Sequence, residues 1–117
     1  MSDFKQRKIV LYKFYFLDFY KSQQKEVKKK IDWTLGLVRD LEIIPEKYFK
    51  HIENSEGIFE IRVKANANIF RIFCFFDDGN LVVIANGFQK KTQKTPPSEI
   101  TKAEKIKKEY LDEKGNE

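Results

Sequence analysis

Cysteine and histidine are almost absent from this chain of 117 residues, which has one of each. The single cysteine, Cys74, cannot form an intramolecular disulfide, and its apolar neighbours predict a buried thiol in a reducing compartment. The only histidine, His51, lies just before a loop-forming segment, where a solvated or capping role is more common than a catalytic one. Neither the Cys/His spacing of a metal site nor a Ser/His/Asp set is present, so no metal or other cofactor is expected.

Long apolar runs and glycine-rich loops are also missing. No run approaches the roughly 20 apolar residues that cross a bilayer, and the N-terminal segment MSDFKQRK lacks the apolar stretch of a signal peptide. The sequence has no glycine-rich phosphate loop and no HExxH motif. These absences exclude the corresponding enzyme classes and predict a soluble cytoplasmic protein with no membrane partner.

Aromatic residues and lysine are abundant instead. Aromatic residues make up 15% of the chain, and eleven of them are Phe, so one domain spanning residues 1–117 can bury enough apolar area to fold. The formal net charge is +5, which favours an acidic partner. From Phe88 to Pro97 there are three lysines and no carboxylate, whereas Glu and Lys alternate after Ser98. The excess positive charge is therefore concentrated in one segment.

The periodicity predicts an α+β fold with the element order β-α(α)-β-β-β-α and a mainly antiparallel sheet. Segment 8–16, rich in β-branched and aromatic residues, indicates a first strand, after which Asp18 is a candidate N-cap. Apolar residues at helical spacing over 27–41 predict an amphipathic helix, and Gly36 is a candidate joint that would divide it in two. One further helical turn is expected over 46–52.

Three strands are expected in the second half of the chain. The alternation over 59–64 predicts a strand with one buried and one polar face, and the turn over 66–68 leads into an apolar segment, 69–76, typical of a central strand covered on both sides. The residues Asp-Asp-Gly-Asn at 77–80 predict a hairpin turn, with the returning strand over 81–88. A terminal helix is expected to begin at Pro96 and Pro97, with a weak apolar stripe formed by Ile100, Ala103, Ile106 and Tyr110.

Arg71 is the most informative charged residue, because a guanidinium on an apolar strand is costly unless it has a partner or serves a site. One interpretation is a structural ion pair, with Glu60 across the hairpin as its partner. The other is a ligand site at the sheet surface, and both can hold together. For Arg62, on the polar face of an outer strand, simple solvation is favoured.

Lys90, Lys91 and Lys94 occur where the chain leaves the last strand and bends toward Pro96, so their ammonium groups are expected to converge near the end of the sheet. Polar residues between them can donate to phosphate and ribose oxygens. On this pattern alone, a phosphate-binding segment and a solvated lysine-rich turn are equally compatible.

The run FEIRVKANANIFRIFCFFDDGNLVVIANGFQKKTQKTPPSEITKA resembles the phage-derived, HigB-like branch of the RelE/ParE toxin superfamily. In that branch an "E-hydrophobic-R" strand, a "YRIFYFF" strand and a "GF-x-KKT-x-KTP-x-x-EI-x-x-A" ending occur in this order. The resemblance is close over about the last half of the chain and extends to the first half in architecture only. It implies the toxin of a type II toxin–antitoxin pair, a ribonuclease that cuts messenger RNA in the ribosomal A site. The expected partners are the ribosome, messenger RNA and a HigA-like helix-turn-helix antitoxin.

The resemblance also implies roles for individual residues. Arg71 and Arg62 match the strand arginines that would clamp the scissile phosphate, and Lys91 is a candidate for proton transfer within a cluster of basic residues. RNA or ribosome binding would involve Lys90, Lys94, Lys64 and Gln89.

The sequence departs from many ribosome-dependent relatives at the position of the acid–base residue. Those relatives carry His or Tyr near the last strand or the C-terminus, where this chain has Asn86 and Gln89, and Tyr110 lies well into the terminal helix. Slow cleavage by charge stabilisation alone and loss of cleavage are both compatible with this departure. The alternative function is a non-enzymatic toxin or binding module on the same fold, such as a ParE-like gyrase poison, a basic RNA-binding domain, or a basic face that only docks an acidic antitoxin.

Overall fold

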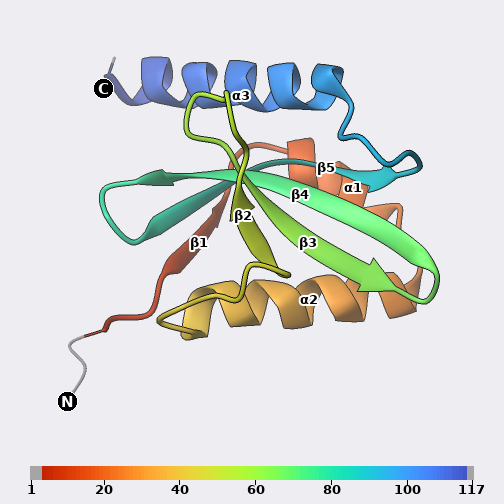
Figure 1. Ribbon diagram of the computed structural model, residues 1–117. Coiled ribbons are helices and arrows are strands. Elements are labelled where there is room, and N and C mark those ends of the chain that lie inside the picture. Colours follow the sequence, from red (N-terminus) through yellow and green to blue (C-terminus); the bar gives the residue numbers. More distant parts are fainter. Residues whose placement is uncertain (1–3, 116–117) are drawn as a thin grey trace.

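Five strands form one mixed sheet in the order β1-β5-β4-β3-β2 in the computed structural model, which describes residues 4–115. The strands are β1 (Lys8–Leu11), β2 (Phe49–His51), β3 (Phe59–Ala65), β4 (Asn68–Asp77) and β5 (Leu81–Lys90). Only the pair β1 and β5 is parallel among these strands, and the other neighbours are antiparallel (Figure 1). The predicted α+β class and mainly antiparallel sheet are confirmed.

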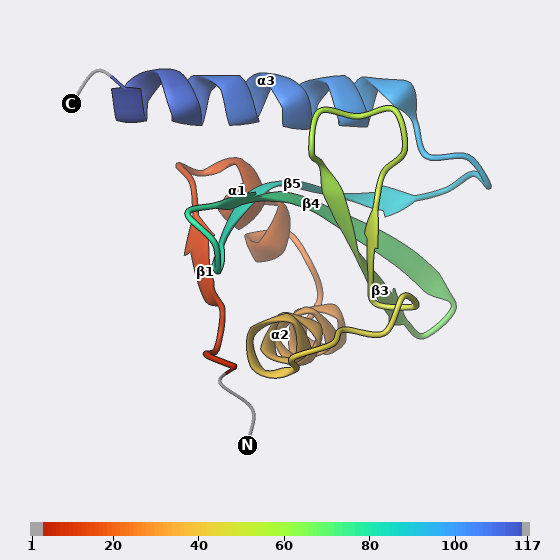
Figure 2. The same ribbon diagram turned by 60° about the vertical axis from the view of Figure 1, so that its left-hand side comes forward.

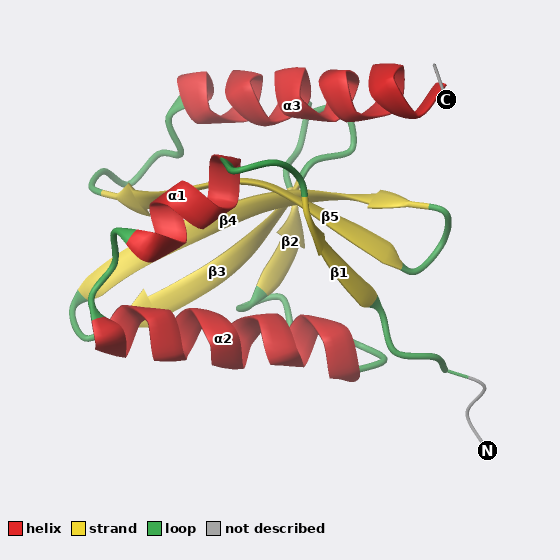
Figure 3. Cartoon of the chain, turned by 180° about the vertical axis from the view of Figure 1, so that it is seen from behind, coloured by secondary structure: helices red, strands yellow, loops and turns green. Residues whose placement is uncertain are grey.

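Three helices cover the two faces of the sheet. They are α1 (Tyr15–Lys21), α2 (Lys25–Asp40) and α3 (Pro97–Gly115). Figure 2 shows α3 along one face with α2 on the opposite side, and Figure 3 shows α1 and α2 together on that second side. This three-layer arrangement is consistent with the RelE-like fold that the resemblance implied. Within residues 4–115, none of the helices has the length and hydropathy of a segment that crosses a bilayer.

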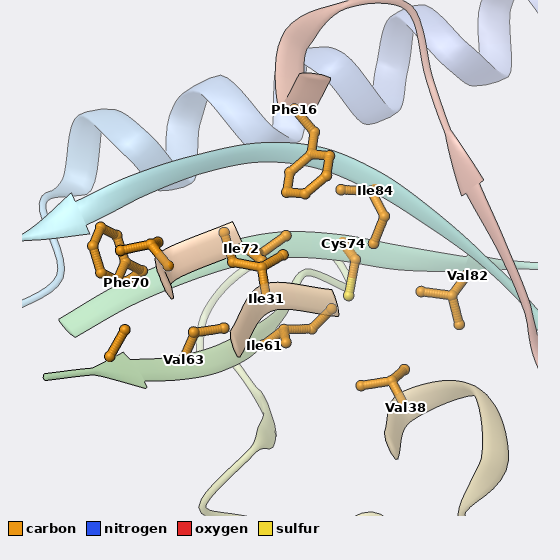
Figure 4. Close-up of a cluster of buried hydrophobic side chains, with 12 residues drawn as sticks. Phe16, Ile31, Val38, Ile61, Val63, Phe70, Ile72, Cys74, Val82 and Ile84 are labelled. Atoms are coloured by element: carbon orange, nitrogen blue, oxygen red, sulfur yellow. The ribbon is translucent and has the colours of Figure 1, made fainter. Parts of the chain in front are cut away.

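The central strand β4 is buried on both faces, as its nearly continuous apolar sequence predicted. Ile72 and Cys74 face α1 and α2, where they pack with Phe16, Ile31 and Val82 among others (Figure 4). Phe73 and Phe75 point to the other face, where they pack against Ala103 and Ile106 of α3. Cys74 is fully buried, and this burial raises the pKa of its thiol. The sheet is therefore the centre of two hydrophobic cores, one on each side.

A glycine on β5 allows α1 to approach the sheet closely. A Cβ built on Gly87 would lie 2.5 Å from Cδ2 of Phe19, which is far inside van der Waals contact. The Phe16 and Phe19 rings lie on the same short helix with centroids 6.1 Å apart, and the Phe19 ring also contacts that of Phe70 on β4 at a centroid distance of 6.2 Å. Close packing of α1 therefore depends on the missing side chain at position 87.

The first strand is shorter than expected. β1 ends at Leu11, the chain turns through Lys13 with φ of +54°, and α1 begins at Tyr15. The strand prediction over 8–16 was wrong beyond Leu11 because aromatic residues with high strand propensity are placed here by packing of a helix face. Asp18 is also not an N-cap, since it lies within α1.

Two further local predictions were wrong. α2 runs unbroken through Gly36, because buried residues on either side, Ile31 and Val38, hold the helix on the sheet and offset the low helix propensity of glycine. The joint between the two helices lies at residues 22–24 instead. Segment 46–52 forms a turn, closed by the Tyr48 N–H donating to Pro45 O at 2.9 Å, and then the strand β2, which pairs with the edge of β3.

Candidate nucleic-acid interface

A cleft of about 510 Å³ opens beside the outer edge of β3. It exists because β2 is much shorter than β3: β2 pairs only with Phe59–Ile61, and the last contact is the Arg62 N–H donating to Tyr48 O at 2.8 Å. The lining residues come from α2, the segment before β2, β3, the β3–β4 turn and β4, and they are Lys30, Lys47, Tyr48, Arg62, Val63, Lys64, Asn66, Ile69 and Arg71. Five of them are Lys or Arg and none is Asp or Glu. Such a lining favours a polyanion.

Two arginines of the cleft face each other across the β3–β4 ladder. Arg62 and Arg71 are directly opposed, and Glu60 lies two residues before Arg62 on the same face of β3. Arg62 Nε donates to Glu60 Oε1 at 2.8 Å, and Arg71 Nε lies 3.7 Å from Glu60 Oε2. Because like charges at opposed positions repel, the buried Glu60 carboxylate is needed to hold both guanidiniums in place. The ion pair expected between Arg71 and Glu60 is confirmed.

Simple solvation, the interpretation favoured for Arg62, was wrong. The Arg62 side chain is 31% exposed and is bonded to Glu60, because neighbouring even-numbered residues of β3 share one face of the sheet. Its two Nη atoms have no protein acceptor among residues 4–115. A planar guanidinium held at Nε with free Nη donors suits bidentate contact with phosphate.

Arg71 is the more buried of the two arginines, with a side chain that is 11% exposed. Its Nη1 donates to Phe70 O at 3.2 Å, while the buried Nε has no hydrogen-bond partner in the described part of the chain. Burial lowers the pKa of Arg71, Glu60 opposes this effect, and nearby Arg62 adds to it. An anion in the cleft would therefore relieve an electrostatic cost that Glu60 offsets only in part.

Of the other residues expected in a site, only Lys64 joins these arginines in the cleft lining. Lys90 is still part of β5 and is paired with Ile69, a lining residue, but it does not itself line the cleft. Gln89 is paired with Phe70, which is buried against α1 and α2, so Gln89 faces away from Arg71 by strand alternation. Lys91 and Lys94 are exposed in the segment between β5 and α3, outside the cleft lining.

The residues weighed for acid–base work also lie outside the cleft. Asn86 is buried and donates from Nδ2 to Glu99 Oε1 at 3.1 Å, which ties β5 to the first turn of α3. His51 is exposed on β2, where its ring contacts the Phe59 ring. Tyr110 donates from its hydroxyl to Asp77 Oδ2 at 2.7 Å. All three side chains have local structural contacts that account for their positions.

The structure adds four polar residues to the cleft that the sequence did not indicate: Lys30, Lys47, Tyr48 and Asn66. Lys30 is one of several lysines on α2, and nothing in the periodicity distinguishes it from the others. Lys47 and Tyr48 were expected in a helical turn, and they reach the cleft because the chain enters β2 at that point. Among the described residues, no group of three or more His, Cys, Asp or Glu side chains is arranged to hold a metal ion.

A comparison with protein families gives a match over most of the chain. The model described as "Phage derived protein Gp49-like (DUF891)" matches residues 18–108. This region includes every residue that lines the cleft and the whole sheet except β1. No curated protein shows a significant match to the chain.

Proposed function

Because the chain belongs to the phage-derived Gp49-like family, we propose that it is the toxin of a type II toxin–antitoxin pair and that it cuts messenger RNA on the ribosome. The observation that supports this proposal is the cleft at the edge of β3, where five Lys and Arg residues converge without a carboxylate in the lining. Within the proposal, the motifs from Glu60 to Ala103 favour the HigB-like branch of the RelE/ParE superfamily.

The proposed reaction is attack of a ribose 2′-hydroxyl oxygen on the adjacent phosphorus atom. The new O2′–P bond forms as the P–O5′ bond breaks, so negative charge develops on the phosphoryl oxygens and then on the leaving O5′. Water takes the 2′-hydroxyl proton and supplies one to O5′, and the products are a 2′,3′-cyclic phosphate and a 5′-hydroxyl end. The Nη donors of Arg62 and the Nη2 donors of Arg71 are suited to those oxygens because guanidinium donors match phosphate geometry. Lys30, Lys47 and Lys64 would hold the flanking phosphates.

The lysines at the end of β5 and in the segment after it fit a docking role better than a chemical one. Lys91 was a candidate for proton transfer, but it is exposed on the segment that leads to α3, outside the cleft lining. We therefore assign Lys90, Lys91 and Lys94 to contacts with messenger or ribosomal RNA beyond the cleft. The expected rate enhancement then comes mainly from charge stabilisation by the arginines.

The proposed partner in the cell is a cognate antitoxin, expected to be a HigA-like helix-turn-helix protein. A type II pair is encoded by adjacent genes, so the neighbouring gene is predicted to encode a short DNA-binding protein. Inspection of that gene and co-purification of its product with the chain test the assignment. Failure of the two proteins to associate would contradict it.

Expression in growing cells tests the function directly. The wild-type chain is expected to stop growth and to truncate messages at codon-related positions, detected by mapping RNA 5′ ends. Arg71→Ala should abolish both effects, whereas Lys105→Ala, an exposed position on α3 outside the cleft lining, should leave both unchanged. Circular dichroism of the purified variants controls for folding. Intact messages accompanied by DNA damage would contradict the nuclease function.

A non-enzymatic toxin on the same fold is the second candidate. The observation that favours it is the absence of His, Asp and Glu from the cleft lining, because efficient RNA cleavage normally uses a side chain that moves protons. In this case the wild-type chain would stop growth while messages stay intact. The same 5′-end mapping distinguishes the two candidates.

A further inference from the structure

Trp33 of α2 and Tyr48, from the segment before β2, form an aromatic pair beside the basic cleft. We propose that this pair is a stacking platform for an unpaired base of an RNA strand whose phosphates lie in the cleft. The inference rests on the proposed function, because it specifies the ligand of the same site as single-stranded RNA.

The two rings are presented by segments that the fold places side by side. Figure 1 shows the chain returning along α2 before it enters β2. The ring centroids of Trp33 and Tyr48 are 5.6 Å apart with an interplanar angle of 78°, an edge-to-face contact that leaves ring surface uncovered. Trp33 is 47% exposed, which is unusual for so large an aromatic side chain. Tyr48 lines the cleft, and its hydroxyl has no hydrogen-bond partner among residues 4–115.

Each ring of the pair has a lysine ammonium group over one of its faces, so a base would stack on the other face. Lys30 Nζ lies 4.1 Å from the Trp33 ring centroid, and Lys47 Nζ lies 4.9 Å from the Tyr48 ring centroid. Both lysines also line the cleft. Aromatic surface for the base and ammonium groups for the phosphates on either side of it are the two features that single-strand binding sites combine.

This combination selects an unpaired strand over the other polyanions. In an RNA duplex the bases are stacked on one another. A duplex would therefore bring phosphates to the lysines but no unpaired base to the rings. An acidic protein segment would likewise use the cations and leave the exposed Trp33 surface without a matched group. A single strand satisfies both the charge of the cleft and the aromatic pair.

The platform is connected rigidly to the arginines. The Arg62 N–H donates to Tyr48 O at 2.8 Å, so the residue that carries one ring is bonded to the residue that carries one guanidinium. A base stacked on Tyr48 would therefore be held at a set distance from the phosphate bound by Arg62 and Arg71. Stacking would position the strand for the proposed reaction as well as increase its affinity.

Two 2′-O-methyl oligonucleotides of equal length test the platform by fluorescence anisotropy, since neither can be cleaved by attack of a 2′-hydroxyl. One carries bases, and the other has abasic sugars with the same phosphates. The wild-type chain is expected to bind the base-bearing strand about tenfold more tightly. This preference should be lost in Tyr48→Ala and Trp33→Ala, and kept in Tyr48→Phe, which retains the ring without the hydroxyl.

A matched control is Phe14→Ala, which removes an exposed aromatic side chain that does not line the cleft and should leave the preference unchanged. Equal affinity of the wild-type chain for the two strands would overturn the platform and leave the RNA-binding function standing. The platform would also be overturned if Tyr48→Ala and Trp33→Ala kept the preference for the base-bearing strand. Failure to bind either strand would overturn the platform together with the phosphate-binding role of the cleft, whereas cleavage on the ribosome is tested separately by the mapping of RNA 5′ ends.

Discussion

Arg62 and Arg71 lie directly opposite one another on β3 and β4, and both guanidiniums are paired with the same buried carboxylate, Glu60. One carboxylate cannot neutralise two guanidiniums, so the three residues keep one net positive charge at the edge of the cleft. Arg62 also keeps Nη donors that have no acceptor in the described residues. The same ion pairs that stabilise the sheet thus leave the arginines able to bind an anion.

Removal of the shared carboxylate should destabilise the fold. Glu60→Gln keeps the size of the side chain but leaves two opposed arginines without a counter-charge, and we expect the free energy of unfolding to fall by about 2 kcal/mol, measured by urea denaturation. The double variant Glu60→Gln/Arg71→Met should recover part of this loss, because no buried charge is then left unpaired. The control is Glu53→Gln, at an exposed position. Wild-type stability in Glu60→Gln would show that this carboxylate does not hold the arginines.

Contacts with several phosphates make RNA affinity depend on salt. A plot of the logarithm of the binding constant against the logarithm of salt concentration should be steep for the wild-type chain, and Lys64→Gln should reduce its slope by about 0.7, the value for one phosphate contact with a single strand. Lys105→Gln, outside the cleft lining, should leave the slope unchanged. A wild-type affinity that changes little between low and physiological salt would contradict the phosphate-binding cleft.

Two glycine substitutions should have opposite effects on stability. Gly87→Ala brings a Cβ to 2.5 Å from Phe19 and should lower the free energy of unfolding by about 1–3 kcal/mol. Gly36→Ala lies within α2, and the nearest atom to its Cβ is Arg39 Nη2 at 4.0 Å, so it should raise stability by up to about 1 kcal/mol. Thermal or urea unfolding of both variants measures the difference. Equal stability of the two variants would contradict the close packing of α1 on β5.

Asp77 should contribute stability that depends on pH. Hydrogen bonds from Lys114 Nζ, at 2.8 Å to Oδ2, and from Tyr110 lower the pKa of Asp77 below its usual value of 3.8. A carboxylate with a lowered pKa stabilises the folded state above its usual pKa, and this contribution is lost as the pH falls through the lowered value. Asp77→Asn should therefore be less stable than the wild-type chain near neutral pH.

Asp77→Asn and the wild-type chain should become equally stable in strong acid, where Asp77 is protonated in both the folded and the unfolded state. Urea unfolding at a series of pH values measures the difference. Asp112→Asn, which removes an exposed ion pair with Lys108, is the matched control and should show a much smaller effect. A difference between Asp77→Asn and the wild-type chain that is the same at every pH would contradict the ionic contribution.

Elements with a strong local pattern were predictable from the sequence. The hairpin between β4 and β5 was expected from Asp78 and Gly79, which adopt φ of +47° and +75°. Alternation identified β3, a nearly continuous apolar run identified β4, and β5 was expected to return after the hairpin turn. β2 was not predictable, because three residues carry little periodicity and their conformation is decided by hydrogen bonds to β3. The end of β1 was not predictable either, because packing of Phe16 and Phe19 in the core favours a helix over a longer strand.

The sequence by itself determined the α+β class, the long meander and the need of Arg71 for a charged partner, because the apolar residues around this guanidinium in the sequence already place it on a buried strand. Only the tertiary structure decided where the cleft lies and which residues join Arg62, Arg71 and Lys64 in it. Lys30, Lys47 and Tyr48 are distant from the arginines in sequence, and they meet them because β2 pairs with the edge of β3 and stops short of its end. Local sequence patterns indicate which face of an element is buried. A site formed where one strand extends beyond the end of its neighbour depends instead on contacts between elements.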